Sequence, residues 1–160
     1  MALEIDLDRI DRGIITALQN NARLTNKELA ARVGLAPSSC RERVRKLVDA
    51  GVFRGFHADV LPAALGVGVR AILAVRLRDQ GLEAVRAFTE LAAGLPEVVE
   101  FFHVAGEDDF LLHVAVRDVA HLNALWSHAI GRDDVVARVR TSLVFDHSRR
   151  ASQADLSQSG

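Results

Sequence analysis

Hydrophobic positions in the first third of the chain recur at the spacing of helices. The first set predicts a helix over residues 6–20, with an apolar face made by Leu7, Ile10, Ile14, Ile15 and Leu18. Thr25 and Glu28 have the spacing of a capping box, in which each side chain accepts a backbone N–H at a helix start. This second helix is expected to end at Gly34, because glycine readily takes the left-handed conformation of a helix end.

A third helix is predicted from Pro37 to about Ala50, since proline suits a first helical turn and Gly51 suits its end. Its buried stripe is expected to be Cys40, Val44, Leu47 and Val48. Two helices joined by a tight glycine turn, the second polar and basic on its outer side, are typical of a helix-turn-helix. Residues 52–60 predict a following strand, which would make the motif winged.

The second half of the chain alternates predicted strands with predicted helices. The helices cover residues 82–94 and 118–130, and the strands cover residues 69–78, 98–105, 110–117 and 135–146. This β-α-β-β-α-β order is typical of a ferredoxin-like domain.

We therefore expect an α+β protein. The expected parts are a winged helix-turn-helix domain (1–59), a linker with Pro62 and two glycines (60–68), the ferredoxin-like domain (69–146) and a mobile polar tail (147–160).

The predicted strands of the second half place apolar residues side by side rather than alternately. Examples are Phe101 with Phe102 and Leu111 with Leu112. A sheet with helices on one face should alternate, so we expect its open face to pack against a second copy in a two-fold dimer. Such a dimer would suit a palindromic DNA operator with half-sites about one helical turn, or a multiple of one turn, apart. The alternative is that the apolar pairs reflect only an ambiguous periodicity.

Charge is distributed unevenly along a chain whose net charge is only -1. Residues 1–59 carry 10 Lys/Arg against 8 Asp/Glu, whereas residues 60–146 carry 8 against 12. A local basic surface on the third helix would suit DNA phosphates. Cys40 is the single cysteine and no apolar run approaches the ~20 residues of a membrane helix, so we expect a cytoplasmic protein away from membranes.

The outer side of the third helix supplies the candidate DNA contacts. Ser38, Ser39, Glu42 and Lys46 are placed for groove contact, while Arg41, Arg43 and Arg45 could reach phosphate or guanine. The alternative is an ordinary solvated charged helix face.

Catalytic and metal-binding patterns are not recognisable in the sequence. The six histidines lack a CxxC or HExxH context, and no phosphate-binding loop is present. A His103–His113 pair across the second and third strands is the one metal alternative. We expect no metal, no cofactor and no enzyme activity. The alternative of an enzyme with a regulatory ferredoxin-like half is disfavoured, because the sequence shows a helix-turn-helix and no catalytic constellation.

Three stretches together resemble the Lrp/AsnC (feast/famine) family of transcriptional regulators, from Leu7 to about His147. They are LDRIDRGIITALQNNARLTNKELAARVGLAPSSCRERVRKLVDAGVFRGF, AGEDDFLLHVAV and VRTSLVF. The last two are also similar to actinobacterial regulators of alanine dehydrogenase. The resemblance implies that the ferredoxin-like domain is of the RAM or ACT type. It further implies a homodimer swapped around its linker strands and assembled into tetramers or octamers. It also implies control of amino-acid metabolism genes by a small molecule, usually an amino acid, bound in the C-terminal domain at contacts between dimers.

An amino acid needs partners of both charges, and the link Gly106-Glu107-Asp108-Asp109 offers backbone N–H groups and carboxylates. By resemblance, Asp109 is the expected ammonium partner. The other implied effector positions are His103, Ala105, Val119, Ser142 and Leu143. Glu107, Asp108 and Ser142 depart from the family pattern, so the effector's identity does not transfer. The alternative function is a nucleoid-architectural protein that wraps DNA without a ligand.

Overall fold

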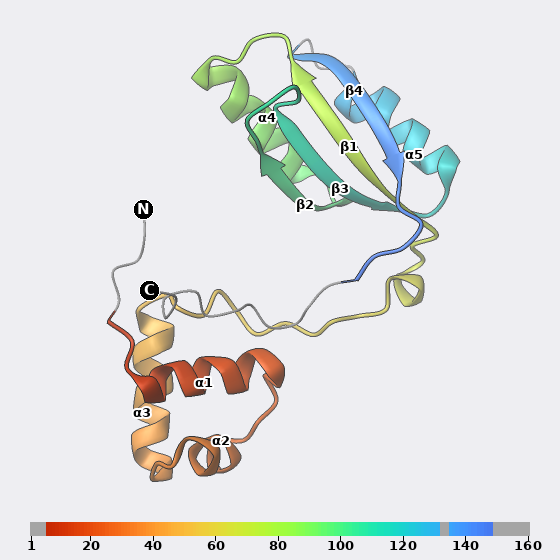
Figure 1. Cartoon of the computed structure of the whole chain (residues 1–160). Helices are drawn as coiled ribbons and strands as arrows, with labels where there is room; N and C mark the ends of the chain where they lie inside the picture. Colours follow the sequence, from red (N-terminus) through yellow and green to blue (C-terminus); the bar gives the residue numbers. More distant parts are fainter. Residues whose placement is uncertain (1–5, 132–134, 149–160) are drawn as a thin grey trace. The chain divides into compact units, whose positions relative to one another are not determined.

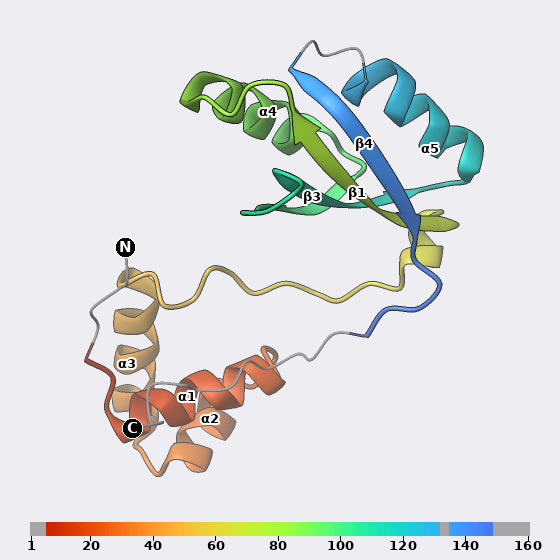
Figure 2. The same cartoon turned by 45° about the horizontal axis from the view of Figure 1, so that its top comes forward.

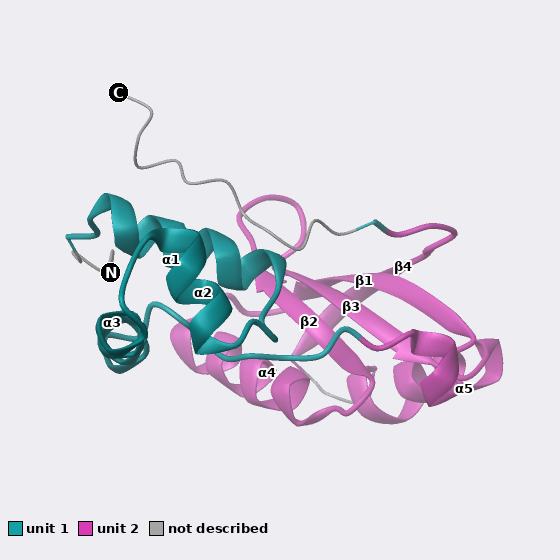
Figure 3. Ribbon diagram, turned by 90° about the horizontal axis from the view of Figure 1, so that it is seen from below, with its two compact units in different colours: residues 1–59, 148–160 teal, residues 60–147 magenta. Residues whose placement is uncertain are grey.

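The computed structural model describes residues 6–131 and 135–148, which form two compact units divided between Asp59 and Val60 (Figures 1 and 3). The first unit contains three helices and the second has the order β-α-β-β-α-β, so the predicted α+β fold class is confirmed. Most of the predicted polar tail, residues 149–160, lies outside the described residues.

The first unit packs three helices around a small apolar core. Ile14, Leu29, Cys40 and Leu47 are at most 4% exposed. Cys40 is therefore a core residue, and burial raises the pKa of its thiol. The helices are α1 (Arg9–Asn20), α2 (Asn26–Val33) and α3 (Pro37–Asp49).

The turn between α2 and α3 is fixed by the predicted local signals. The capping box is present: the Glu28 N–H donates to Thr25 Oγ1 (3.3 Å) and the Thr25 N–H donates to Glu28 Oε2 (2.8 Å). Gly34 ends α2 with φ of 70°, in the left-handed region. The Asn26 side chain then donates to the Pro37 carbonyl (2.8 Å), which ties the first residues of the two helices together.

Three local predictions differ from the structure. The strand expected over residues 52–60 is absent, because a strand needs a partner's backbone groups and the described part of the chain pairs none with this segment. Val48 is 42% exposed rather than buried, since the core contacts of α3 are made on the side of Cys40 and Leu47. The helix expected over residues 118–130 changes after Leu125 into one π-helical turn, Trp126–Ile130.

The second unit is a four-stranded antiparallel sheet in the order β2-β3-β1-β4. Both of its longer helices lie on the same face of the sheet (Figures 2 and 3). A short 3-10 helix, Pro62–Leu65, precedes the first strand. The elements are β1 (Val69–Leu77), α4 (Leu82–Gly94), β2 (Val98–His103), β3 (Phe110–Val116), α5 (Val119–Leu125) and β4 (Val136–Leu143).

The register explains the adjacent apolar residues of the strands. Phe101 lies opposite Leu112 on the helix-covered face, where Leu112 is completely buried. Phe102 lies opposite Leu111 on the other face and is 50% exposed. The prediction that both faces are apolar in places is confirmed. We define the open sheet face by the residues that alternate away from the helices: Arg70, Ile72, Ala74, Arg76, Glu100, Phe102, Leu111, His113, Ala115, Arg138, Arg140 and Ser142.

Candidate DNA and ligand sites

The outer side of α3 presents most of the predicted DNA-contacting residues to solvent. Arg43 is the exception, because its side chain is half-buried against α1. Six of the seven predicted residues are exposed: Ser38, Ser39, Arg41, Glu42, Arg45 and Lys46.

The four cations of α3 differ in what they contact. Lys46 Nζ lies 3.2 Å from Glu42 Oε1, one helical turn away, and both side chains are well exposed. Arg41 and Arg45 make no ion pair with any residue that the structure describes. Exposed and unpaired guanidinium groups are suited to phosphate contact, since no internal partner has to be given up.

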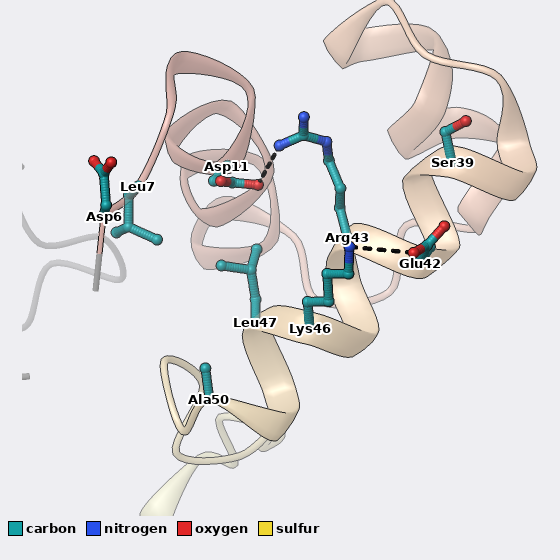
Figure 4. A pocket seen from close by; sticks show the side chains of 9 residues that line it. All are labelled: Asp6, Leu7, Asp11, Ser39, Glu42, Arg43, Lys46, Leu47 and Ala50. Carbon is teal, nitrogen blue, oxygen red and sulfur yellow. Dashed lines mark hydrogen bonds and ion pairs between the residues drawn. The ribbon is translucent and has the colours of Figure 1, made fainter. Parts of the chain in front are cut away.

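Arg43 instead points toward the N-terminus of α1 (Figure 4). Its Nη1 lies 2.6 Å from Asp8 Oδ2 and 2.9 Å from Asp11 Oδ1. The hydrogen bonds that Arg43 donates to Asp11 and Asp8 raise the pKa of Arg43. The pKa of Asp8 is lowered, first by the backbone N–H of Asp11 and then by the Arg43 side chain. Both shifts favour the ionised forms and so favour the ion pair.

The β2–β3 link, with its three consecutive acids, lies at one end of the sheet beside three arginines. Glu107 Oε1 lies 2.7 Å from Arg138 Nη2, and Asp108 Oδ2 lies 2.6 Å from Arg140 Nη2. Arg76 donates to the Glu107 carbonyl (2.6 Å) and to the Gly106 carbonyl (3.1 Å). The hydrogen bond from Arg138 lowers the pKa of Glu107.

Asp109, the predicted ammonium partner, faces the interior of the second unit. It is 8% exposed. Its Oδ2 accepts the Leu77 N–H (2.8 Å) and its Oδ1 accepts the Gln80 side-chain amide (2.8 Å). Both oxygens therefore hold the segment that leads from β1 to α4.

The remaining predicted effector residues are spread along the sheet. Ala105 is exposed next to the link, and His103 stacks on Phe110 with ring centroids 4.8 Å apart. Ser142 and Leu143 are level with His113 and Val114, roughly 10–13 Å from Phe110 along β3 at about 3.3 Å per residue. Val119 follows the far end of β3, roughly 20 Å from Phe110 on the same scale. One chain does not bring the two groups together.

The register also answers the question of a histidine pair. His103 lies opposite Phe110, whereas His113 lies opposite Glu100, so the two rings are not cross-strand partners. No group of three or more metal-ligating side chains occurs among the described residues. No helix in the described ranges is long and apolar enough to cross a membrane.

Sequence reasoning missed the three arginines that meet the acidic link. Arg138 and Arg140 are two residues apart on β4 and Arg76 is opposite Arg138 on β1, so all three point to one face. The period of two was visible in the sequence as Arg-Val-Arg. Their partners required the strand order, which brings β4 beside β1 and the link to the same end.

Comparisons with known proteins match both units. Residues 7–54 match the family described as winged helix-turn-helix DNA-binding, and residues 70–153 match the Lrp/AsnC ligand binding domain. The HTH-type transcriptional regulator AldR of Mycolicibacterium smegmatis is 44% identical over 147 residues, covering 92% of this chain and 86% of that protein. The leucine-responsive regulatory protein of Rhizobium meliloti is 36% identical over 156 residues, covering 98% and 100%.

A solved structure extends the likeness to three dimensions. The transcriptional regulator of Neisseria meningitidis in complex with L-Met has a TM-score of 0.87 at 31% identity, and the match covers 95% of this chain and 98% of that one. All three are named as regulators, two of them as transcriptional regulators, and none is named as an enzyme. The chain belongs to the Lrp/AsnC family of DNA-binding transcriptional regulators, with a helix-turn-helix unit and a ligand-binding unit.

Proposed function

We propose that this regulator changes its DNA binding in response to an amino acid held near the link from Gly106 to Asp109. The observation that carries the proposal is the cluster of acid–arginine pairs there, with Arg138 on Glu107 and Arg140 on Asp108. A zwitterion presents both charges, so its ammonium can replace an arginine at a carboxylate while its carboxylate takes that arginine. The similarity to a regulator solved with L-Met supports an amino acid as the class of ligand.

The ammonium partner in this proposal is first the carboxylate of Glu107, whose side chain is 69% exposed. Asp108 and Asp109 are further contacts, because each is only 8% exposed and already accepts hydrogen bonds on both oxygens. Gly106 has φ of 137° and open space where a side chain would stand, so a ligand can approach its backbone closely. Ser142 and Leu143 are three to four residues along the sheet from Phe110, and Val119 follows the far end of β3, so in this proposal they reach the ligand from another copy.

The second part of the proposal is a two-fold dimer formed through the open sheet face. Ile72, Ala74, Phe102 and Leu111 supply an apolar centre on the face opposite the one that the described helices of this unit cover. A second copy is the simplest complementary surface. The dimer would present two α3 helices to a palindromic operator, with Ser38, Ser39, Arg41, Glu42, Arg45 and Lys46 as the contacting residues. Further assembly to tetramers or octamers would bring the two effector regions together, and the protein would act at the cytoplasmic nucleoid.

A thermal-shift screen of the twenty amino acids tests the ligand. A ligand that binds only the folded protein stabilises it by about 2.7 kcal/mol at ~100 times its Kd. We expect one amino acid or a small chemical group of them to stabilise the wild type. The response should weaken in Glu107→Gln and persist in the control Glu90→Gln, an exposed acid on α4. Silence across all twenty would instead favour the nucleoid-architectural alternative.

A further inference from the structure

We propose that Arg43 is a positioning residue for DNA recognition, which fixes α3 on the N-terminus of α1 and does not itself contact DNA. The inference rests on the proposed DNA-contacting face of α3. It separates Arg43 from Arg41 and Arg45, which the sequence places in the same basic helix. Asp8 and Asp11 divide their four carboxylate oxygens between the cap of α1 and the Arg43 side chain.

Each of these two carboxylates serves α1 with one oxygen and α3 with the other. Asp8 Oδ1 accepts the N–H groups of Ile10 and Asp11, both at 2.8 Å, and so caps α1. Asp11 Oδ2 accepts the Asp8 N–H at 3.3 Å and completes the capping box. The remaining oxygens, Asp8 Oδ2 and Asp11 Oδ1, both accept from Arg43 Nη1. The helix cap and the contact to α3 are therefore one network.

Breaking this network to reach a phosphate would be unfavourable. Arg43 would leave two carboxylates without their cation, and these acids would then lie near the incoming phosphates. Arg41 and Arg45 have no such internal partners among the described residues. Base contacts require α3 to be held in place, while non-specific binding depends mainly on charge near the phosphates. Loss of the network should therefore reduce discrimination between sequences more than it reduces DNA binding in general.

The experiment compares Arg43→Gln, Asp11→Asn and the matched control Arg45→Gln in the full-length protein. The DNA probes are a duplex selected from a random pool with the wild type and a scrambled duplex of the same length. Affinity for both is measured over a range of salt concentrations. For Arg43→Gln we expect the ratio of specific to non-specific affinity to fall by about five-fold or more, because misplaced base contacts are lost. The slope of log K against log salt should stay unchanged.

The two other variants are expected to change different quantities: Arg45→Gln the salt slope, and Asp11→Asn the specificity ratio. Arg45→Gln should reduce the salt slope by about 0.9, the value for one phosphate contact. Asp11→Asn keeps an oxygen for the Asp8 N–H but loses its charge next to Arg43. Removal of an acid near DNA should strengthen binding, yet we expect the same fall in the specificity ratio as for Arg43→Gln.

Several results would overturn the inference. One is a flattened salt slope in Arg43→Gln, which would show a phosphate contact. Another is an unchanged specificity ratio in Asp11→Asn. Equal losses on both duplexes for Arg43→Gln would indicate a folding defect alone. If the wild type selects no sequence from the pool, the proposed sequence-specific regulation is contradicted. The salt slopes measured on a random duplex still decide whether Arg43 contacts a phosphate.

Discussion

Three consecutive acids in the β2–β3 link have different surroundings although they share one sequence context. Glu107 is exposed and pairs with Arg138, Asp108 pairs with Arg140, and Asp109 turns inward to backbone and amide donors. Neighbouring side chains along an extended segment point in opposite directions, which separates the three acids. Their partners, however, come largely from β1 and β4. The chemistry of each acid is therefore decided by the strand order rather than by its neighbours in sequence.

Asp109→Ala should destabilise the second unit by about 1–3 kcal/mol, because the buried Leu77 N–H would lose its acceptor. Urea unfolding followed by a probe in the second unit measures this loss. Glu107→Gln, at an exposed acid of the same link, should change stability far less. Equal stability of the two variants would show that Asp109 has no bracing role and is free to serve a ligand alone.

His113 predicts a pH dependence of stability. Burial lowers the pKa of His113, His147 and Arg70 lower it further, and Glu100 opposes them. Its Nε2 has no hydrogen-bond partner among the described residues. The unfolded chain therefore takes up a proton at higher pH than the folded chain, so stability is complete above the unfolded pKa and falls as the pH drops below about 6.5.

Chemical unfolding at about pH 7.5 and about pH 5.5 measures this effect. His113→Gln should lose that part of the pH dependence, whereas His128→Gln, at an exposed histidine, should keep it. A wild-type protein that is equally stable at both values, or more stable in acid, would contradict the expected direction.

At the scale of elements, substitutions at Gly34 and Gly94 test whether the left-handed conformation of Gly34 is the reason that α2 ends there. Gly34 has φ of 70° and nothing within 4 Å of the place where a Cβ would stand, so Gly34→Ala is expected to cost about 1 kcal/mol through backbone strain alone. Gly94, at the end of α4, has equally open space but no positive φ. Gly94→Ala should be neutral or slightly stabilising. Denaturant unfolding of both variants gives the comparison, and equal effects would reject the conformational explanation.

The elements that could be predicted from sequence are those specified by local signals. The capping box at Thr25, the left-handed Gly34 and the start of α3 at Pro37 depend on residues a few positions apart. The segment 52–60 has a strand-like composition, but a strand forms only where a partner exists, and composition contains no information on that. The π-turn after Leu125 likewise has no local signature that we recognised.

Sites were harder to predict than elements, because they depend on contacts between distant residues. Arg43 and Arg45 are equivalent in charge and both lie in α3, yet only Arg43 meets Asp8 and Asp11, more than thirty residues earlier. The arginines around the acidic link come from β1 and β4 for the same reason. Helical projection gives the side of α3, but the packing of α1 decides which cation on that side stays free.

At the scale of the whole molecule, the proposed dimer would connect the open sheet face with DNA recognition. Recognition by paired α3 helices would need two chains in a fixed relation, and this face is an apolar surface that a second copy could cover. In a two-fold interface every substitution occurs twice, so a single buried charge is a strong perturbation.

Phe102→Lys should therefore convert the assembled protein into smaller species. Covering a half-exposed phenylalanine contributes roughly 1.5 kcal/mol or more per copy, and a lysine there would have to be buried without a partner. Analytical ultracentrifugation measures the mass, with Leu82→Lys on α4 as a control at a 67% exposed apolar position away from the sheet. The smaller species should also bind a palindromic duplex no better than a single half-site, since the two α3 helices are no longer connected. If Phe102→Lys kept the wild-type mass and Leu82→Lys dissociated instead, the interface would have to be formed by the helices and not by the open sheet face.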